Sequence, residues 1–320
     1  MIRLYSPEGG ILGTTENKEA LSTPASLEKA MQKGQIVEGI ATRCDERMRL
    51  HVDLGCAHGI IEPEESVMCR AGEVRKDIAI ISRVGKAVAC KIMGLEMRDG
   101  ILLARLSRRE AQRECFEGYL QTLRAGDLIG AKVTHMEPFG AFLDIGCGVS
   151  SLLSVDCISV SRISHPKDRL THGMPLRVAV KCINRETERI YVTLRELLGT
   201  WVENAASFEA GQTVTGIIRS VESYGVFVEL TPNLAGLAEV SEERAAELKG
   251  KIGQRVAVYI KSILPERMKI KLVLVDSCTV PVGAPTPLRF FTGTFENGHV
   301  DRWRYSPPDS PKTVETVFEE

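Results

Sequence analysis

The chain has 320 residues, of which 41 are Lys or Arg and 42 are Asp or Glu, so its formal net charge is −1. This balance excludes a strongly basic protein that wraps nucleic acid, and it confines any nucleic-acid site to a local patch. A hydrophobic fraction of 43% excludes general disorder, and the length predicts two or three domains.

The nine cysteines are scattered singly, and no two of them are spaced as CxxC. This pattern predicts reduced thiols rather than disulfides or a zinc site. Residues 1–25 lack the apolar segment of a signal peptide, and no apolar run approaches the roughly 20 residues that cross a bilayer. We therefore expect a soluble, cytoplasmic protein with no cofactor, no bound metal and no membrane partner.

An internal repeat predicts the architecture. Gly34-Gln35-Ile36-Val37 recurs as Gly126-Asp127-Leu128-Ile129 and as Gly211-Gln212-Thr213-Val214. Each copy opens a series of five short strand-like segments, and residues 189–195 show the clearest alternation of polar and apolar side chains. Five strands with one apolar face suit a small closed barrel, which leaves no exposed sheet edge. The sequence thus predicts an all-β protein of three tandem five-stranded barrels.

The segments between the repeats predict helical linkers and two extensions. Ser107 is a candidate N-cap for the first linker, and Thr200 with Glu203 fits a capping box in the second. The predicted organisation is an N-terminal extension (1–28), a divergent first barrel (29–106), a helical linker (107–124), a second barrel (125–195), a second helical linker (196–209), a third barrel (210–276) and a tail rich in proline and aromatic residues (277–320).

Two of the repeats resemble a known family. Residues 126–148 read GDLIGAKVTHMEPFGAFLDIGCG, which resembles the opening of the S1-type RNA-binding domain. Residues 212–237 resemble it too, with Tyr224 and Phe227 at the aromatic positions, and residues 59–63 are similar to the N-terminal repeats of bacterial ribosomal S1 proteins. The resemblance implies one OB-fold barrel per repeat and the binding of single-stranded RNA.

The resemblance also implies which side chains meet RNA. Two aromatic residues on the second strand of each barrel would stack on bases, and basic side chains would contact phosphates. Gly140 permits a bend that would turn Phe139 outward together with Phe142. The candidates in the second barrel are Lys132, Phe139, Phe142, Ser154, Arg162, Lys181, Asn184, Arg189, Tyr191 and Arg195, and those in the third are Tyr224, Phe227, Lys261 and Lys269.

Two parts of the chain depart from this pattern. The first repeat has Met48 and His51 at the aromatic positions, which favours protein docking over RNA binding there. In the tail, Asn297-Gly298 is a strong turn signal that predicts a hairpin pairing residues 290–295 with residues 299–305. We expect this hairpin to pack on the third barrel, with partner docking or RNA stacking as alternatives.

No motif of a known enzyme class is present, because the chain lacks a phosphate-binding loop, a dinucleotide fingerprint and a nucleophile elbow. We therefore predict a non-enzymatic, bacterial-type monomer that binds single-stranded RNA such as mRNA, with the ribosome as a further partner, and acts in translation or mRNA handling. The alternative is a docking scaffold on the ribosome or an RNA-decay complex, with incidental RNA contact.

Overall fold

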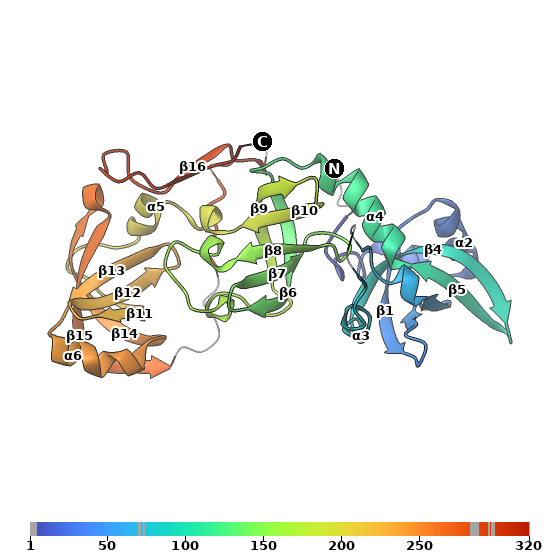
Figure 1. The fold of residues 1–320 in the computed structure, drawn as a ribbon, viewed down its shortest axis with the longest axis horizontal. Helices are drawn as coiled ribbons and strands as arrows, with labels where there is room; N and C mark the ends of the chain where they lie inside the picture. Colours follow the sequence, from blue (N-terminus) through green and yellow to red (C-terminus); the bar gives the residue numbers. More distant parts are fainter. Residues whose placement is uncertain are drawn as a thin grey trace.

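Three closed five-stranded barrels lie in a row along the long axis of the molecule (Figure 1). The computed structural model describes residues 5–69, 72, 74–281, 288–293, 295 and 298–319, and for residues 276–281 it describes the backbone alone. Among these residues, the third and fifth strands of each barrel pair in parallel and the other pairs are antiparallel. This is the topology of the OB-fold.

The strand bounds repeat from barrel to barrel. The first barrel contains β1 (Val37–Cys44), β2 (Leu50–Asp53), β3 (His58–Ile61), β4 (Ala87–Arg98) and β5 (Ile101–Ser107). The second contains β6 (Leu128–Glu137), β7 (Gly140–Asp144), β8 (Ser150–Ser154), β9 (Pro175–Asn184) and β10 (Arg189–Thr193). The third contains β11 (Thr213–Glu222), β12 (Gly225–Thr231), β13 (Leu234–Glu239), β14 (Gln254–Leu264) and β15 (Lys269–Pro281).

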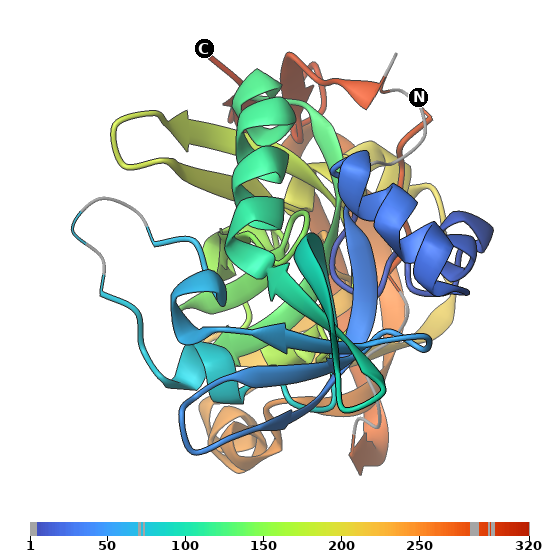
Figure 2. The same ribbon diagram turned by 90° about the vertical axis from the view of Figure 1, so that its right-hand side faces the viewer.

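Short helices cover the barrel ends and join the barrels. They are α1 (Thr15–Ala20), α2 (Pro24–Gln32), α3 (Ile78–Ile81), α4 (Arg108–Gly118), α5 (Trp201–Ala205) and α6 (Glu242–Leu248), with 3-10 turns η1 (Pro63–Glu65), η2 (Leu120–Thr122), η3 (Val155–Cys157), η4 (Pro166–Asp168), η5 (Arg195–Leu198), η6 (Lys249–Lys251) and η7 (Pro265–Arg267). Ser107 caps α4, and Thr200 with Glu203 forms the predicted capping box of α5. In the end-on view of Figure 2, α4 (green) stands upright, with the N-terminal helices (blue) to its right.

The glycine that opens each repeat has a backbone conformation that explains its recurrence. Gly34, Gly126 and Gly211 have φ angles of +62°, +92° and +94°, a region that other residues rarely adopt. Gly126 also lies so close to the tail that an added Cβ would stand 2.1 Å from the carbonyl oxygen of Val300. The repeated glycine is thus a turn residue, and in the second barrel it is a contact point as well.

The predicted hairpin in the tail is wrong. Strand β16 (Arg302–Arg304) pairs with β17 (Glu315–Val317), and His299 forms a bridge with Asp127 at the start of the second barrel. The turn residue Asn297 lies outside the described residues. A hydrogen bond between His299 Nδ1 and Asp127 Oδ1 (2.6 Å) and one from the Val300 amide to the Gly126 carbonyl oxygen (3.0 Å) hold this part of the tail against the second barrel.

A buried carboxylate joins the first two barrels. Glu8 is only 5% exposed, and its side chain accepts hydrogen bonds from Arg108 Nε (2.5 Å) and from the Ala89 amide (3.2 Å). Its backbone amide donates to Asp144 Oδ2 (2.7 Å), and Lys132 Nζ donates to its carbonyl oxygen (2.9 Å). The N-terminal segment therefore ties the first barrel and α4 to the second barrel.

Burial changes the ionisation of both acids at this junction. Burial alone would raise the pKa of Glu8, but Arg108 and Arg83 hold it below its usual value. Burial and the neighbouring Glu8 carboxylate raise the pKa of Asp144 to about 7. The junction thus holds one carboxylate that is fully paired with arginine and a second that is costly to charge.

A second charge cluster joins the second and third barrels. Arg169, which follows η4, forms a buried ion pair with Glu229 on β12, and Arg219 on β11 donates to the same carboxylate from 2.7 Å. Asn233 donates from Nδ2 to the carbonyl oxygens of Arg195 (2.7 Å) and Gly199 (2.8 Å). These contacts fix the orientation of the third barrel against the second.

Eight cysteines have side chains that the structure describes, and all eight are free thiols. The side chain of Cys278 lies outside the described residues. In the described part of the chain, no helix combines the length and the apolar composition needed to span a bilayer.

We predict that Glu8→Gln destabilises the protein by about 3–5 kcal/mol, because it leaves Arg108 buried without a full counter-charge. The matched control is Glu28→Gln on the exposed face of α2, for which we expect a change under about 0.5 kcal/mol. Urea unfolding of the full-length variants measures both effects, and equal unfolding midpoints would contradict the role assigned to Glu8.

We predict that Gly211→Ala costs about 1 kcal/mol of stability, from backbone strain alone. Gly126→Ala should cost more, about 2–3 kcal/mol, because strain is joined by the clash with Val300. An added Cβ at Gly211 meets no described atom within 4 Å, so this pair of variants separates the two causes in thermal unfolding.

Candidate nucleic-acid interface

A row of five side chains crosses the outer face of the second barrel. The strand register places His135 opposite Phe142, Phe142 opposite Leu152, Leu152 opposite Tyr191 and Tyr191 opposite Cys182. Directly opposed residues on paired strands have neighbouring side chains on one face. All five side chains are exposed or half-buried, so the row is an accessible strip across the barrel.

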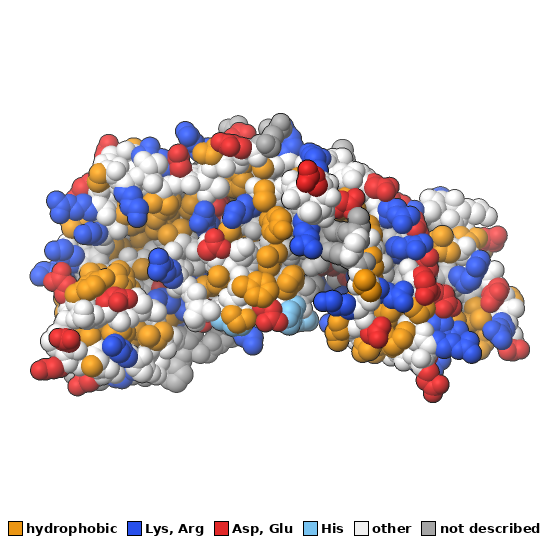
Figure 3. Space-filling view, in the orientation of Figure 1, with side chains coloured by type: hydrophobic (Ala, Val, Ile, Leu, Met, Phe, Trp, Pro, Cys, Tyr) orange, Lys and Arg blue, Asp and Glu red, His pale blue; other side chains and the backbone are white. Residues whose placement is uncertain are grey.

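The aromatic residues of this strip form a stacking platform. Phe139 lies in the turn before β7, is 56% exposed and meets Phe142 edge-on, with ring centroids 6.0 Å apart. The imidazole of His135 stacks on the other side of Phe142, 6.2 Å away at an angle of 25°. Figure 3 shows hydrophobic and histidine side chains gathered over β6 and β7. Exposed rings of this kind bind bases by stacking, at about 1–3 kcal/mol per base.

A bulge in β6 brings His135 to this face, and the sequence analysis missed it. The register of β6 against β7 shifts between Val133 and His135, so one extra residue is inserted there. Without the shift, strand alternation would place His135 on the same side as the buried Val133. The first and third barrels have the same shift, before Arg43 and before Ser220. Period-two alternation in the sequence gives no signal for such a bulge.

Polar candidates flank the strip at the β9–β10 hairpin and at the end of β8. Arg189 lies two residues before Tyr191 on β10 and pairs with Asn184 of β9. Ser154 lies two residues after Leu152 on β8 and pairs with Gly140 of β7. Lys181 sits at a bulge in β9, and its Nζ lies 3.1 Å from Cys157 Sγ. This hydrogen bond raises the pKa of Lys181, so the ammonium group stays charged. The structure therefore places these four predicted residues along the border of the strip.

Three other candidates of the second barrel lie outside the strip. Lys132 is bound to the carbonyl oxygen of Glu8 at the junction of the first two barrels. Arg195 Nη2 donates to Thr316 Oγ1 of the tail (3.1 Å), and Arg162 is exposed in the loop after η3. The prediction that all ten residues form one surface is thus too broad, since Lys132 belongs to a structural contact.

The third barrel has an equivalent strip with a different composition. Its row is Ser220, Phe227, Leu237, Lys271 and Ser262. Tyr224 is 59% exposed and meets Phe227 edge-on, with ring centroids 6.4 Å apart. The sequence analysis named Lys261 and Lys269, which are exposed nearby, but missed Lys271 at the position of Tyr191. The third barrel therefore offers one ring pair and a cation.

In the first barrel the equivalent strip has no exposed ring pair. Its row is Arg43, His51, Ile60, Arg105 and Gly94. His51 is buried, with Nε2 3.0 Å from Asp45 Oδ2 and Nδ1 2.8 Å from His58 Nε2. The imidazole that replaces the phenylalanine is thus held by its neighbours, and the face is not a stacking platform.

Comparison with known proteins defines the class of the second barrel. Residues 122–195 match the family described as S1 RNA binding domain, and this range includes all five strands of the barrel. The second barrel is therefore the part of the chain that matches the S1 RNA binding domain family. The chain as a whole is similar to small ribosomal subunit protein bS1.

Two relatives show the extent of this similarity. The chain is 31% identical over 198 residues to bS1 of Staphylococcus aureus, which is 59% of this chain and 50% of that protein. It is 30% identical over 266 residues to bS1 of Rhodopseudomonas palustris, which is 80% of this chain and 45% of that protein. The chain thus spans about half the length of these curated relatives.

Among solved structures, a multidomain protein with nucleic acid binding domains from Streptococcus pneumoniae is 14% identical, with a TM-score of 0.23 over 76% of this chain and 74% of that chain. GSP13 from Bacillus subtilis is 20% identical, with a TM-score of 0.22 over 23% of this chain and 57% of that chain.

The placement of the two lysines yields a prediction. Lys181→Ala should weaken binding of single-stranded RNA about two- to fivefold at low salt, because one phosphate contact is lost. Lys132→Ala should leave the affinity within about 1.5-fold, since its ammonium is held at the barrel junction. Titration of a labelled RNA measures both, and equal losses would show that only the overall charge matters.

Proposed function

We propose that this protein binds single-stranded RNA, with mRNA as the cellular ligand, through the outer face of the second barrel and acts in translation or mRNA handling. The observation that supports this most directly is the exposed platform of His135, Phe142 and Phe139 within an S1 RNA-binding domain. The rings would stack on successive bases, and Lys181 and Arg189 would contact phosphates beside them.

The third barrel adds a second contact of the same kind. Tyr224 and Phe227 repeat the edge-on ring pair, and Lys261, Lys269 and Lys271 supply cations. Glu239 lies opposite Gly225 at the edge of this face and opposes phosphate binding, which makes the third site the weaker one. Since buried ion pairs fix the two barrels together, one RNA strand that spans both sites would bind more tightly than either site alone.

The first barrel supports the second candidate function, which is protein docking. Its β4–β5 hairpin exposes three apolar side chains, with Met93 at 51%, Met97 at 68% and Ile101 at 57%. Exposed apolar side chains grouped on one element are typical of protein-binding surfaces. This candidate concerns a different barrel, so it is compatible with RNA binding by the second one.

We predict that Phe139→Ala/Phe142→Ala weakens RNA binding at least about tenfold, because two stacking surfaces are removed. The measurement is fluorescence anisotropy with a labelled, unstructured RNA of about 15 nucleotides, a length within OB-fold site sizes. Tyr224→Ala/Phe227→Ala should give a smaller loss that shrinks further when the RNA is shortened.

The control is Tyr259→Ala, which removes an exposed ring on β14 that lies outside the strip of the third barrel. It should leave the affinity unchanged. Binding that is absent at low salt, or that is indifferent to the loss of Phe139 and Phe142, would overturn the proposed function and favour the docking scaffold.

A further inference from the structure

A groove of about 430 Å³ lies between the second barrel and the tail. One wall comes from η3 and the loop after it, with Val155, Asp156 and Arg162, and the other comes from the tail, with Trp303 and Thr316. The volume is within the range of about 300–1,000 Å³ that is usual for small-ligand sites. The groove is thus large enough for part of a polymer such as one nucleotide.

The groove begins next to the stacking platform. The amide of Val155, in its wall, donates a hydrogen bond to the carbonyl oxygen of Phe139 (2.9 Å). Ser154, which precedes Val155, lies opposite Gly140 at the start of the ring-bearing strand. An RNA strand that passes from the ring of Phe139 toward Val155 would therefore enter the groove.

The polar groups around the groove suit a nucleotide. Arg162 is exposed and forms no hydrogen bond or ion pair with any residue that the structure describes. Arg195 contacts Glu196 and Thr316 with two of its N–H groups, and a guanidinium has five. Figure 3 shows Lys and Arg side chains between the ring patch and the tail strand β16. These donors would face the phosphate of a bound nucleotide.

Apolar side chains also line the groove, among them Val160, Ile163 and Trp303. Trp303 is 5% exposed, and its indole N–H has no hydrogen-bond partner among the described residues. Buried indole N–H groups usually have a partner. Asp156 and Glu315 also border the groove, where their carboxylates would repel a phosphate and could accept from the amino group of a base. These groups favour a base inside and its phosphate at the rim.

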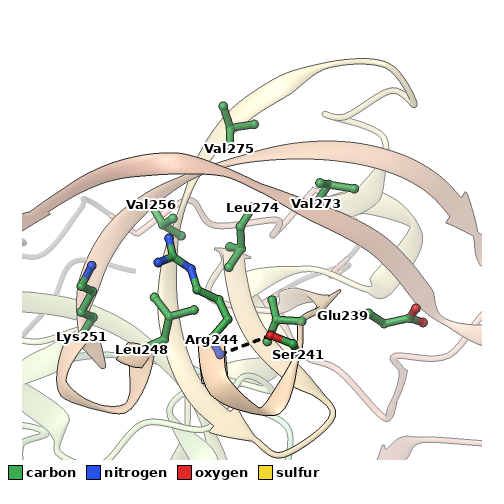
Figure 4. A pocket seen from close by; sticks show the side chains of 10 residues that line it. Glu239, Ser241, Arg244, Leu248, Lys251, Val256, Val273, Leu274 and Val275 are labelled. Atoms are coloured by element: carbon green, nitrogen blue, oxygen red, sulfur yellow. Dashed lines mark hydrogen bonds between the residues drawn. The ribbon is translucent and has the colours of Figure 1, made fainter. Parts of the chain in front are cut away.

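The third barrel has a groove at the equivalent position, and the comparison shows what the tail adds. This groove of about 280 Å³ starts at Glu239 and Val240, the counterparts of Ser154 and Val155, and Figure 4 shows Val273, Leu274 and Val275 along it. Val275 lies four residues after Lys271, as Arg195 lies four residues after Tyr191, the residue paired at the equivalent position. No tail residue lines it among the described residues. The groove at the second barrel therefore differs in having tail residues as one wall, whereas the groove at the third barrel is lined by residues of that barrel such as Glu239, Arg244 and Lys251.

We propose that the groove between the second barrel and the tail binds the nucleotide that adjoins the bases stacked on Phe139 and Phe142, with Arg162 at its phosphate. The proposal rests on the proposed function, because it extends the same RNA path. It assigns the tail a direct part in RNA binding, as one wall of a composite site.

The test compares Arg162→Gln with Arg177→Gln, which removes an exposed arginine near the far end of β9. RNA affinity is measured by anisotropy over a series of salt concentrations, with RNAs of four and ten nucleotides. On the longer RNA, Arg162→Gln should weaken binding about threefold or more and lower the salt slope by about one, whereas Arg177→Gln should change neither. On the four-nucleotide RNA, Phe142→Ala should still weaken binding, and the effect of Arg162→Gln should shrink.

The outcomes separate this proposal from the one on which it rests. Equal effects of Arg162→Gln and Arg177→Gln, together with a loss in Phe142→Ala, would overturn the groove and leave RNA binding by the platform intact. Indifference to Phe142→Ala would overturn both proposals.

A second measurement reports contact with the tail directly. The ten-nucleotide RNA is prepared with a single 5-iodouridine at each position in turn and is photo-crosslinked to the full-length protein. The position adjacent to one that crosslinks to residues 139–142 should crosslink to residues 303–316. Crosslinks that never reach the tail would overturn the proposal.

Discussion

The arrangement of the three barrels depends on buried carboxylates that must be neutralised by arginine. A charged group removed from water is costly unless it is paired and hydrogen-bonded. Glu8 meets this condition with Arg108 and Arg83 at the first junction, and Glu229 meets it with Arg169 and Arg219 at the second. Glu8 is paired with arginines of the first barrel and α4 while its backbone binds the second barrel, and Glu229 is shared between Arg219 of its own barrel and Arg169 of the second, so both carboxylates connect neighbouring barrels.

Asp144 and Glu229 occupy the same place in their barrels, two residues after Phe142 and Phe227 on the second strand. Alternation puts both the ring and the acid on the outer face. The ring remains accessible, whereas the acid is covered by the preceding segment of the chain. The second strand therefore carries an accessible ring near its start and a buried acid of the barrel junction two residues later.

One barrel scaffold thus provides three different surfaces. Identical bulges in the first strand turn Arg43, His135 and Ser220 outward in the first, second and third barrels. The side chains at these and the neighbouring positions then differ. The second barrel has exposed rings, the third has a ring pair with Lys271, and the first has a histidine held by hydrogen bonds to its neighbours. Packing of the tail adds a further difference, because tail residues form one wall of the groove at the second barrel, whereas the groove at the third is lined by residues of that barrel.

The sequence by itself determined the number of barrels, their strands and the ring pairs, since glycine turns, period-two alternation and capping residues act locally. It did not determine the place of His135, because a bulge leaves no mark on a pattern of period two. Nor did it determine the partner of the tail strand, the role of Glu8 or the position of Lys132. These depend on contacts between residues 100 or more positions apart, such as Glu8 with Arg108 and Asp127 with His299, which only the packing of whole barrels decides.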